Sequence, residues 1–363
     1  MQLGRDFVRA LDQIAEERGL SPDLIVSSLK DALISAYKKY QGGDPQVDVQ
    51  IDLDTGDIIV SERRTIVEEL GSPDTEITLS DAKRLGHSEA VLGDVIDIEK
   101  DPGDFGRIAA QTARQVIIQR LKDAERQSIY DAFSDKVGEM MTGMIFKAER
   151  DQVLVRLGER SEAILPRKER IPGEEYVPGN VMKFYVLEVR KMERGPRIVV
   201  SRTHPGLLRR LMEVEIPELQ QGVIEIRNIV REGGARAKVS LASLDSNVDP
   251  VGACVGSSGS RIKAISNELR GEKVDVIVWS GDPLVYIRNS LSPAQVAKVE
   301  PMLDQERAAR AYVYPDQLSL AIGKTGQNVR LAARLTGWKI DINAIEAERM
   351  PTLQDIFHEV ADQ

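Results

Sequence analysis

The chain has 363 residues but only one cysteine, Cys254, and three histidines. A single cysteine cannot form an internal disulfide, which is typical of proteins from a reducing compartment. The longest apolar runs, such as Val116–Ile118 and Val274–Trp279, are far shorter than the roughly 20 residues that cross a bilayer. The charged N-terminus has no apolar centre of a secretory signal. We therefore expect a cytoplasmic protein without membrane contact.

The sequence also lacks the groupings that catalysis or metal binding needs. His87, His204 and His358 lie in unrelated segments, and no Cys/His spacing of a metal site is present. Cys254 lies on an apolar stretch, where a buried side chain is far commoner than a nucleophile. The carboxylates do not cluster as an acid–base pair would. The sequence thus predicts no catalytic residue, no metal, no cofactor and no enzyme activity.

Charge is distributed unevenly along the chain. The net charge is −9, yet residues 1–137 alone hold 17 Lys/Arg against 27 Asp/Glu. Residues 138–200 hold 12 against 10, and residues 201–345 hold 19 against 16. Such asymmetry indicates different partners for different parts. The alternative is an acidic surface that merely aids solubility.

Residues 1–137 predict an α+β N-terminal domain that ends in a long helix. Apolar residues at helical spacing predict helices near 7–15 and 24–40, and alternating runs at 47–53 and 57–60 predict a hairpin. A short strand is expected near 94–99. Residues 104–136 predict one linking helix of about 45 Å at 1.5 Å per residue. Two helices broken near Ser128 are the alternative.

Residues 138–201 predict a small β-barrel. The strand-like runs are Met144–Phe146, Gln152–Leu157, Ser161–Leu165, Val181–Val189 and Arg197–Ser201. Five strands separated by charged or Gly/Pro turns are typical of an OB-type barrel. The stretch from "TGMIFKAERDQVLVRLGERSEAILPRKER" to "RIVVSR" resembles an S1 RNA-binding domain.

The barrel lacks aromatics where many S1 domains place stacking rings. Leu154 and Pro166 occupy those positions, and a base stacked on an aromatic is worth roughly 1–3 kcal/mol. RNA binding by the barrel, if it occurs, is therefore expected to be weak and electrostatic, with a solvated rim as the alternative. The cationic residues concerned are Arg156, Arg167, Lys168 and Arg170.

The second half of the chain contains an internal repeat. "ACVGSSGSRIKAISNELRGEKVDVIVW" and "LAIGKTGQNVRLAARLTGWKIDINAI" share a G-x-x-G, a helix pattern, a closing glycine and a strand pattern. A duplicated unit of this length is stronger evidence than one short motif. We predict two modules, residues 202–280 and 281–346, followed by a tail over 347–363.

The "GKT" of the second copy does not predict a nucleotide-binding loop. A Walker loop needs a glycine where Leu318 stands, and a strand leading in, whereas residues 316–322 have helical spacing. The matching Gly256–Gly259 has no Lys-Thr at all. Two glycines between helices instead let a sugar-phosphate backbone approach closely, with the second helix pointing its N-terminus at the phosphates. This is the arrangement of KH domains, whose loop clamps about four nucleotides.

The predicted RNA-binding residues follow from this arrangement. In the first copy Ile262, Ile265 and Leu269 are expected to face the core, leaving Arg261 and Lys263 free for phosphates. In the second, Val329, Ala332 and Ala333 face inward, and Lys324 adds charge to the loop. The predicted set comprises Gly256, Ser257, Ser258, Gly259, Arg261, Lys263, Gly323, Lys324, Thr325, Gly326, Gln327, Asn328, Arg330 and Arg334, with Arg156, Arg167 and Lys168 on the barrel.

The chain resembles the NusA family of bacterial transcription elongation, termination and antitermination factors. The resemblance is most specific in "SRTHPGLLRRLMEVEIPEL", "VDPVGACVGSSGSRIKAISNELRGEKVDVIVWS" and "AIGKTGQNVRLAARLTGWKIDI". It implies an N-terminal domain that binds RNA polymerase, an S1 barrel and two tandem type II KH domains that bind single-stranded nascent RNA.

The resemblance further implies modulation of pausing, intrinsic termination and antitermination, with other elongation and antitermination factors as partners. Its RNA-binding loops map onto Gly256–Gly259 and Gly323–Gly326. The first loop lacks the basic residue often found there. We expect a monomer. The alternative is an S1/KH adaptor in translation or RNA turnover, because those modules serve there too.

Overall fold

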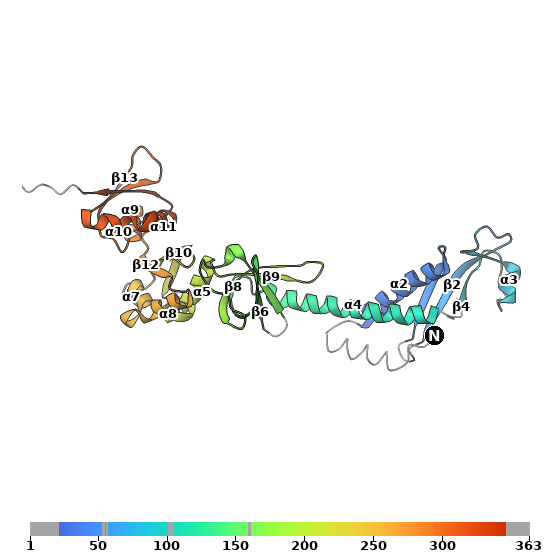
Figure 1. Ribbon diagram of the computed structural model, residues 1–363. Coiled ribbons are helices and arrows are strands. Elements are labelled where there is room, and N and C mark those ends of the chain that lie inside the picture. The colour runs from blue at the N-terminus through green and yellow to red at the C-terminus, as the bar shows by residue number, and fades with distance from the viewer. Residues whose placement is uncertain (1–21, 53–54, 56, 101–104, 159–160, 346–363) are drawn as a thin grey trace, which may run out of the picture. The chain divides into compact units, whose positions relative to one another are not determined.

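A computed structural model describes residues 22–52, 55, 57–100, 105–158 and 161–345. The chain divides into two compact units (Figure 1). The first unit comprises the described residues up to Asp131 together with the short segment Glu193–Gly195. The second unit comprises the rest of the described chain. The helix expected near residues 7–15 and the tail 347–363 lie outside the described residues.

The first unit is a four-stranded sheet with helices. Its elements are α2 (Pro22–Gln41), β1 (Gln46–Ile51), β2 (Ile58–Val67), β3 (Glu76–Thr78), α3 (Leu79–Arg84), β4 (Val95–Lys100) and α4 (Phe105–Ser134). β2 pairs antiparallel with β1 and β4 and parallel with β3. The predicted hairpin is thus present as β1 and β2, although parts of its turn lie outside the described residues.

The core of the first unit joins its sheet to two helices. Leu29, Leu33 and Tyr37 of α2 pack against Val49 of β1, together with Phe105 at the start of α4. The Phe105 ring meets the Tyr37 ring edge-on at 5.2 Å. α4 continues without a break to Ser134, so the alternative of two helices broken near Ser128 is wrong.

Residues 140–201 form a closed five-stranded barrel. Its strands are β5 (Met140–Ala148), β6 (Gln152–Leu157), β7 (Ser161–Pro166), β8 (Val181–Arg190) and β9 (Arg197–Ser201), closed in the order β5-β6-β7-β9-β8. A short 3-10 turn, η1 (Arg167–Glu169), follows β7. Alternate residues of β6, Val153, Val155 and Leu157, fill the interior. The five predicted strands are all present.

The first repeat forms an α-β-β-α-α-β module. Its elements are α5 (Pro205–Glu215), α6 (Pro217–Gln220), β10 (Ile224–Glu232), β11 (Arg236–Ser243), α7 (Pro250–Val255), η2 (Ser257–Gly259), α8 (Ser260–Glu268) and β12 (Lys273–Val278). β11 lies in the middle of the sheet, antiparallel to β10 and parallel to β12.

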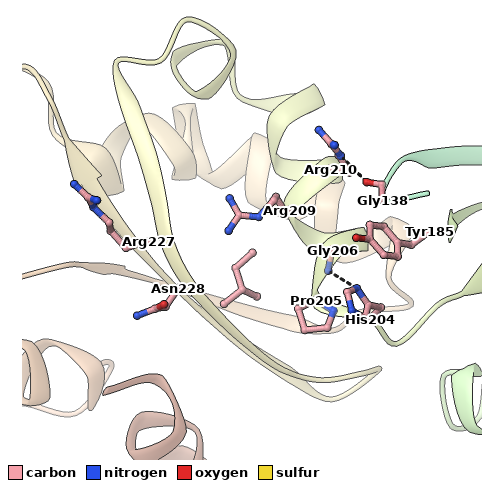
Figure 2. Close-up of a pocket in the computed structure, with 10 residues that line it drawn as sticks. Gly138, Tyr185, His204, Pro205, Gly206, Arg209, Arg210, Arg227 and Asn228 are labelled. Atoms are coloured by element: carbon pink, nitrogen blue, oxygen red, sulfur yellow. Dashed lines mark hydrogen bonds between the residues drawn. The ribbon is translucent and has the colours of Figure 1, made fainter. Parts of the chain in front are cut away.

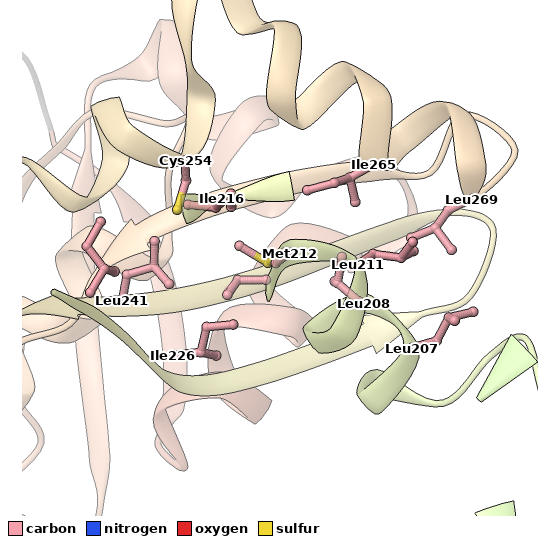
Figure 3. Packing of buried hydrophobic residues seen from close by; sticks show 13 residues of the cluster. Leu207, Leu208, Leu211, Met212, Ile216, Ile226, Leu241, Cys254, Ile265 and Leu269 are labelled. Carbon is pink, nitrogen blue, oxygen red and sulfur yellow. The ribbon is translucent and has the colours of Figure 1, made fainter. Parts of the chain in front are cut away.

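Helices cover one face of this sheet. Figure 3 shows Leu208 and Met212 of α5 in the same cluster as Ile265 of α8 and Leu269, which directly follows α8. Cys254 lies fully buried in that cluster, as its apolar stretch predicts. Burial raises the pKa of its thiol to about 12, which removes any nucleophilic thiolate at neutral pH.

The second repeat has the same order of elements. They are α9 (Pro283–Ser290), β13 (Val296–Pro301), β14 (Ala308–Val313), η3 (Pro315–Gln317), α10 (Leu318–Ile322), η4 (Lys324–Gly326), α11 (Gln327–Thr336) and β15 (Lys339–Ala344). β14 is antiparallel to β13 and parallel to β15. The helices α9, α10 and α11 lie on one side of this sheet (Figure 1). Both repeats therefore have the element order and mixed sheet of type II KH domains.

Buried ion pairs join the barrel to the first repeat. Arg202, which is fully buried, directly follows the last barrel strand. Its guanidinium donates to the Glu174 carboxylate, to the Lys183 carbonyl at 2.8 Å and to the Glu268 carbonyl at the end of α8 at 2.8 Å. Such a guanidinium has partners for most of its five donors, which offsets the cost of burying its charge.

The two repeats also pack directly against each other. Val230 and Ile277 of the first sheet form a buried cluster with Tyr286, Leu331 and Leu335 of the second repeat. The Tyr286 hydroxyl donates to Ser240 Oγ at 2.9 Å. α11 therefore has two apolar faces, one for its own core and one for the neighbouring module. The spacing of Val329, Ala332 and Ala333 predicts only the face toward its own core.

Candidate RNA-binding surface

The two G-x-x-G segments, loop 1 (Gly256–Gly259) and loop 2 (Gly323–Gly326), adopt the same backbone. The first glycines have φ values of 70° and 76°, the last glycines 75° and 72°, and Ser258 and Thr325 both 53°. In each loop the last N–H donates to the first carbonyl, at 3.2 Å in loop 1 and 3.1 Å in loop 2. Positive φ favours glycine at the flanking positions. The sequence repeat is thus a structural repeat.

Each loop leads into a helix whose N-terminus has no side-chain cap. α8 follows Gly259 and α11 follows Gly326, and neither glycine offers a capping atom. By contrast, α5 and α9 are capped by the side chains of His204 and Asp282. The first N–H groups of a helix carry partial positive charge and bind anions when no side chain occupies them. Both loops therefore present helix termini suited to phosphates.

The last glycine of each loop faces open space. A Cβ on Gly326 would meet nothing within 4 Å, and one on Gly259 only the flexible Lys263 side chain, at 3.6 Å. The first glycines are different. A Cβ on Gly323 would lie 2.8 Å from the backbone nitrogen of Asn328, and one on Gly256 would lie 2.9 Å from Arg261 Cγ. The close packing beneath each loop therefore requires its first glycine.

The side chains at the loop tips are exposed and polar. Ser257, Ser258, Lys324 and Thr325 are all solvent-exposed. Lys263 Nζ donates to the Ser258 carbonyl at 3.0 Å. A lysine of α8 thus brings to loop 1 the positive charge that its own Ser-Ser sequence lacks.

Arg261 is not free, contrary to the sequence-based expectation. Its Nη1 donates to the Ala253 carbonyl at 2.6 Å and to Glu218 Oε2 at 2.9 Å. Glu218's own backbone N–H and the Arg261 side chain both lower the pKa of Glu218, so the pair is charged at neutral pH. Arg261, on α8, therefore links its helix to α7 through the Ala253 carbonyl and to the short helix α6 through Glu218.

Arg330 is also paired, although its side chain stays half exposed. Its Nε lies 3.0 Å from Glu232 Oε1 at the end of β10, and Gln327 Nε2 donates to the other oxygen of that carboxylate at 2.8 Å. The Arg330 hydrogen bond lowers the pKa of Glu232. Arg334 is exposed one turn further along the same helix. A carboxylate of the first repeat thus binds the helix that follows loop 2.

Asn328 is a structural residue rather than a surface one. It is fully buried, and its Nδ2 donates to the carbonyls of Leu291, Leu320 and Ala321. Those bonds tie α11 to the end of α10 beneath loop 2. The prediction that the Asn328 side chain contacts RNA is therefore wrong, because no face of it is accessible.

The barrel carries an aromatic that the sequence analysis did not single out. Phe146 is 46% exposed, and the Arg156 guanidinium lies over its ring, 4.7 Å from the centroid. Arg167 and Lys168 are exposed in η1. Arg170 is committed elsewhere, because it donates to the carbonyls of Glu149 and Arg150. Of the four cations named for the barrel, Arg156, Arg167 and Lys168 thus stay accessible, and Arg156 lies over an exposed ring.

Among residues 22–345, apart from the gaps named above, no group of three or more His, Cys, Asp or Glu could hold a metal ion. No helix in the part of the chain described here is long and apolar enough to cross a membrane.

Comparison with known families agrees with this architecture module by module. Residues 6–127 match the NusA N-terminal domain and residues 134–201 the S1 RNA-binding domain. Residues 202–279 match the NusA-like first KH domain, and residues 283–349 the NusA-like second KH domain. The four matches follow one another without overlap.

Similar whole proteins carry the same name. The transcription termination/antitermination protein NusA of Bacillus subtilis is 46% identical over 94% of this chain and 91% of its own length. That of Thermus thermophilus is 46% identical over 95% of this chain and 91% of its own length. The solution structure of the N-terminal domain of NusA from B. subtilis is 41% identical, covers 34% of this chain and 98% of that one, and has a TM-score of 0.31. The chain belongs to the NusA family of transcription termination/antitermination proteins.

Proposed function

We propose that this chain binds RNA polymerase through its first unit and single-stranded nascent RNA through loops 1 and 2, and so modulates pausing, termination and antitermination. The main support is the matched pair of uncapped helix starts behind two exposed G-x-x-G loops. Phosphates can approach glycine backbone closely, and helix N–H groups bind them without reading sequence. We propose that one RNA strand contacts both loops, and the direct packing of the two modules against each other supports this.

The first unit offers exposed apolar side chains for a protein partner. Leu85, Val91, Leu92 and Val95, which lie between α3 and the start of β4, are each more than half exposed. Grouped exposed apolar residues mark protein-docking segments. The excess of acidic residues in this region disfavours RNA. We propose that this segment contacts polymerase.

The RNA-binding part of the proposal is tested by filter binding. The full chain and a fragment of residues 138–345 are expected to retain single-stranded RNA at low salt. Absence of binding by both would contradict the proposal. Gly326→Asp should weaken retention, because it places a carboxylate at an open position where a phosphate would lie.

The polymerase part is tested by capture from cell extract with the full chain as bait. We expect RNA polymerase in the eluate, and we expect Val91→Glu/Leu92→Glu to lose it. Leu303→Glu is the matched control, because Leu303 is 99% exposed but lies in the second KH domain. Recovery of ribosomes without polymerase would support the translation adaptor instead. Family membership favours the transcription role over that adaptor.

A further inference from the structure

A cleft of about 440 Å³ lies where the barrel meets the first KH domain. It is lined by Gly138, Tyr185, His204, Pro205, Gly206, Arg209, Arg210, Arg227, Asn228 and Ile229 (Figure 2). The lining contains three arginines and no Asp or Glu. The net charge of the chain is −9, yet the only lining residues with a fixed charge are arginines. Such a cleft is suited to an anion.

The three arginines have different roles. Arg210 is fixed, because its guanidinium donates to the Gly138 carbonyl at 3.0 Å, to Glu139 at 2.9 Å and to Glu213 at 2.8 Å. Arg209 has no hydrogen bond or ion pair with any residue that the structure describes, and its guanidinium points into the cleft (Figure 2). A half-buried guanidinium without a partner is ready to accept a ligand, since binding need not first break a protein contact.

The wall that Tyr185 and His204 form is uncharged. The rings of Tyr185 and His204 stack at 4.5 Å and 13°. His204 Nδ1 accepts the Gly206 N–H at 3.0 Å, which requires an unprotonated nitrogen, and burial lowers the pKa of this imidazole. A Cβ on Gly206 would fall 2.4 Å from the Tyr185 ring, so the helix α5 packs flat on that ring. The charge of the cleft therefore comes from arginines, whose protonation does not vary near neutral pH.

The far rim combines a cation with an aromatic ring. Arg227 lies 5.1 Å above the centre of the Trp279 ring, which is 36% exposed. Arg227 also pairs with Glu225 at 3.1 Å, but both side chains are well exposed, and such pairs are readily displaced. The cleft thus has the unpartnered Arg209 inside it and, at its rim, a displaceable Arg227 beside the exposed Trp279 ring. Cations for phosphates together with an exposed ring are the combination that single-stranded nucleic acid favours over a small anion.

We propose that this cleft binds the backbone of single-stranded RNA, with Arg209 and Arg227 on phosphates and Trp279 beside a base. It would add a third contact region to loops 1 and 2 on the strand that those loops hold. Tyr185 and His204 are not expected to stack on bases, because their rings stack on each other. This inference rests on the proposed RNA binding of the two loops.

The test compares Arg209→Ala and Arg227→Ala with the intact full chain on a 5-nucleotide and a 20-nucleotide RNA. Affinity is measured across a series of salt concentrations. One lost phosphate contact should reduce the slope of log affinity against log salt by about 0.7 for a single strand. We expect that reduction for the longer RNA and little change for the shorter one, which the loops alone can hold.

Two controls separate charge from structure. Arg209→Lys keeps the positive charge and should restore most of the slope, whereas a merely structural arginine would not be rescued in this readout. Arg107→Ala removes the same charge from an exposed position on α4 in the first unit and should change nothing. Trp279→Ala should weaken the longer RNA severalfold without altering the slope, since stacking releases no counterions.

The outcomes distinguish this inference from the function on which it rests. If the intact chain binds neither RNA, the proposed function itself fails. If it binds both and Gly326→Asp weakens both, but Arg209→Ala leaves the long-RNA slope unchanged, only the cleft proposal is overturned. An equal loss on both lengths would also overturn it, because it would show damage at the loops. An Arg209→Ala variant that binds RNA normally but no longer binds an oligoglutamate peptide would overturn it too, because the cleft would then bind an acidic peptide rather than RNA.

Discussion

Arg330 Nε lies 3.0 Å from Glu232 Oε1, so an arginine of the second KH domain is held by a carboxylate of the first. The same carboxylate accepts a hydrogen bond from Gln327 at 2.8 Å, in the first turn of the helix behind loop 2. A phosphate arriving at this helix start must therefore compete with Glu232. The pair links domain packing to RNA binding through one acid.

Replacing that acid by its neutral isostere should tighten RNA binding. Glu232→Gln frees Arg330 and removes a repelling charge, so the affinity for RNA should rise by roughly two- to fivefold. Filter binding at low salt measures the change. Glu300→Gln is the control, because Glu300 pairs with Lys298 on β13 rather than with the helix behind loop 2. Weaker binding by Glu232→Gln would contradict this role.

The same pair predicts a pH dependence for the KH–KH contact. The pKa of Glu232 lies below its ordinary value in the folded chain, because Arg330 donates to the carboxylate. The stability that it contributes is therefore complete above the unfolded pKa and is lost as pH falls through the folded pKa. The difference in unfolding midpoint between the intact chain and Glu232→Gln should shrink on acidification below about pH 4. A difference that grows there would exclude this account.

The two loops should differ in sensitivity to a new acid. Gly323→Asp is expected to weaken RNA binding about tenfold or more, and Gly256→Asp to weaken it less. At Gly323 the added Cβ meets the backbone of Asn328 and the new carboxylate lies beside Lys324, whereas at Gly256 it meets the side chains of Arg261 and Ser260, and loop 1 has no basic residue of its own. Equal losses, or the reverse order, in a binding titration would count against the argument.

The buried Arg202 should matter for stability rather than for RNA contact. Arg202→Met leaves the Glu174 carboxylate, which is 2% exposed, without its cationic partner, and breaking a buried ion pair costs roughly 3–5 kcal/mol. Urea unfolding of the full chain measures the loss. The double variant Glu174→Gln/Arg202→Met should recover part of it. A single variant as stable as the intact chain would show that the joint between barrel and KH domain does not depend on this pair.

Cys254 should be chemically silent in the folded protein. Its thiol is fully buried, and burial raises its pKa to about 12, so almost no thiolate exists at pH 8. A disulfide reagent at that pH should label the native chain only on the timescale of unfolding, and should label it at once in denaturant. Fast labelling of the native chain would place Cys254 outside the core.

Most of the architecture could be read from periodicity. The five barrel strands, the long helix and the paired G-x-x-G modules each depend on local patterns of apolar residues and glycine, and the structure has all of them. The inward faces of α8 and α11 were also predicted, because Ile265, Leu269 and Ala332 recur at helical spacing. Local rules succeed where the partner of a residue lies within a few turns of chain.

Two of the errors concern contacts between segments far apart in sequence. Glu218 pairs with Arg261, which lies 43 residues away, and Glu232 pairs with Arg330, which lies 98 residues away. No local sequence pattern indicates either pair. Asn328 looks like a polar loop residue but lies beneath the loop, where its amide satisfies three carbonyls. The second apolar face of α11, with Leu331 and Leu335, was a signal in the sequence. Leucines on the face opposite the predicted core indicate a second packing partner.

The most direct test of the whole account is photocrosslinking of the full chain to a single-stranded RNA that carries 4-thiouridine, followed by peptide mapping. We predict crosslinked peptides that contain Gly256–Gly259 and Gly323–Gly326, with none from residues 22–131. Crosslinks confined to residues 22–131, with both G-x-x-G peptides unmodified, would contradict it.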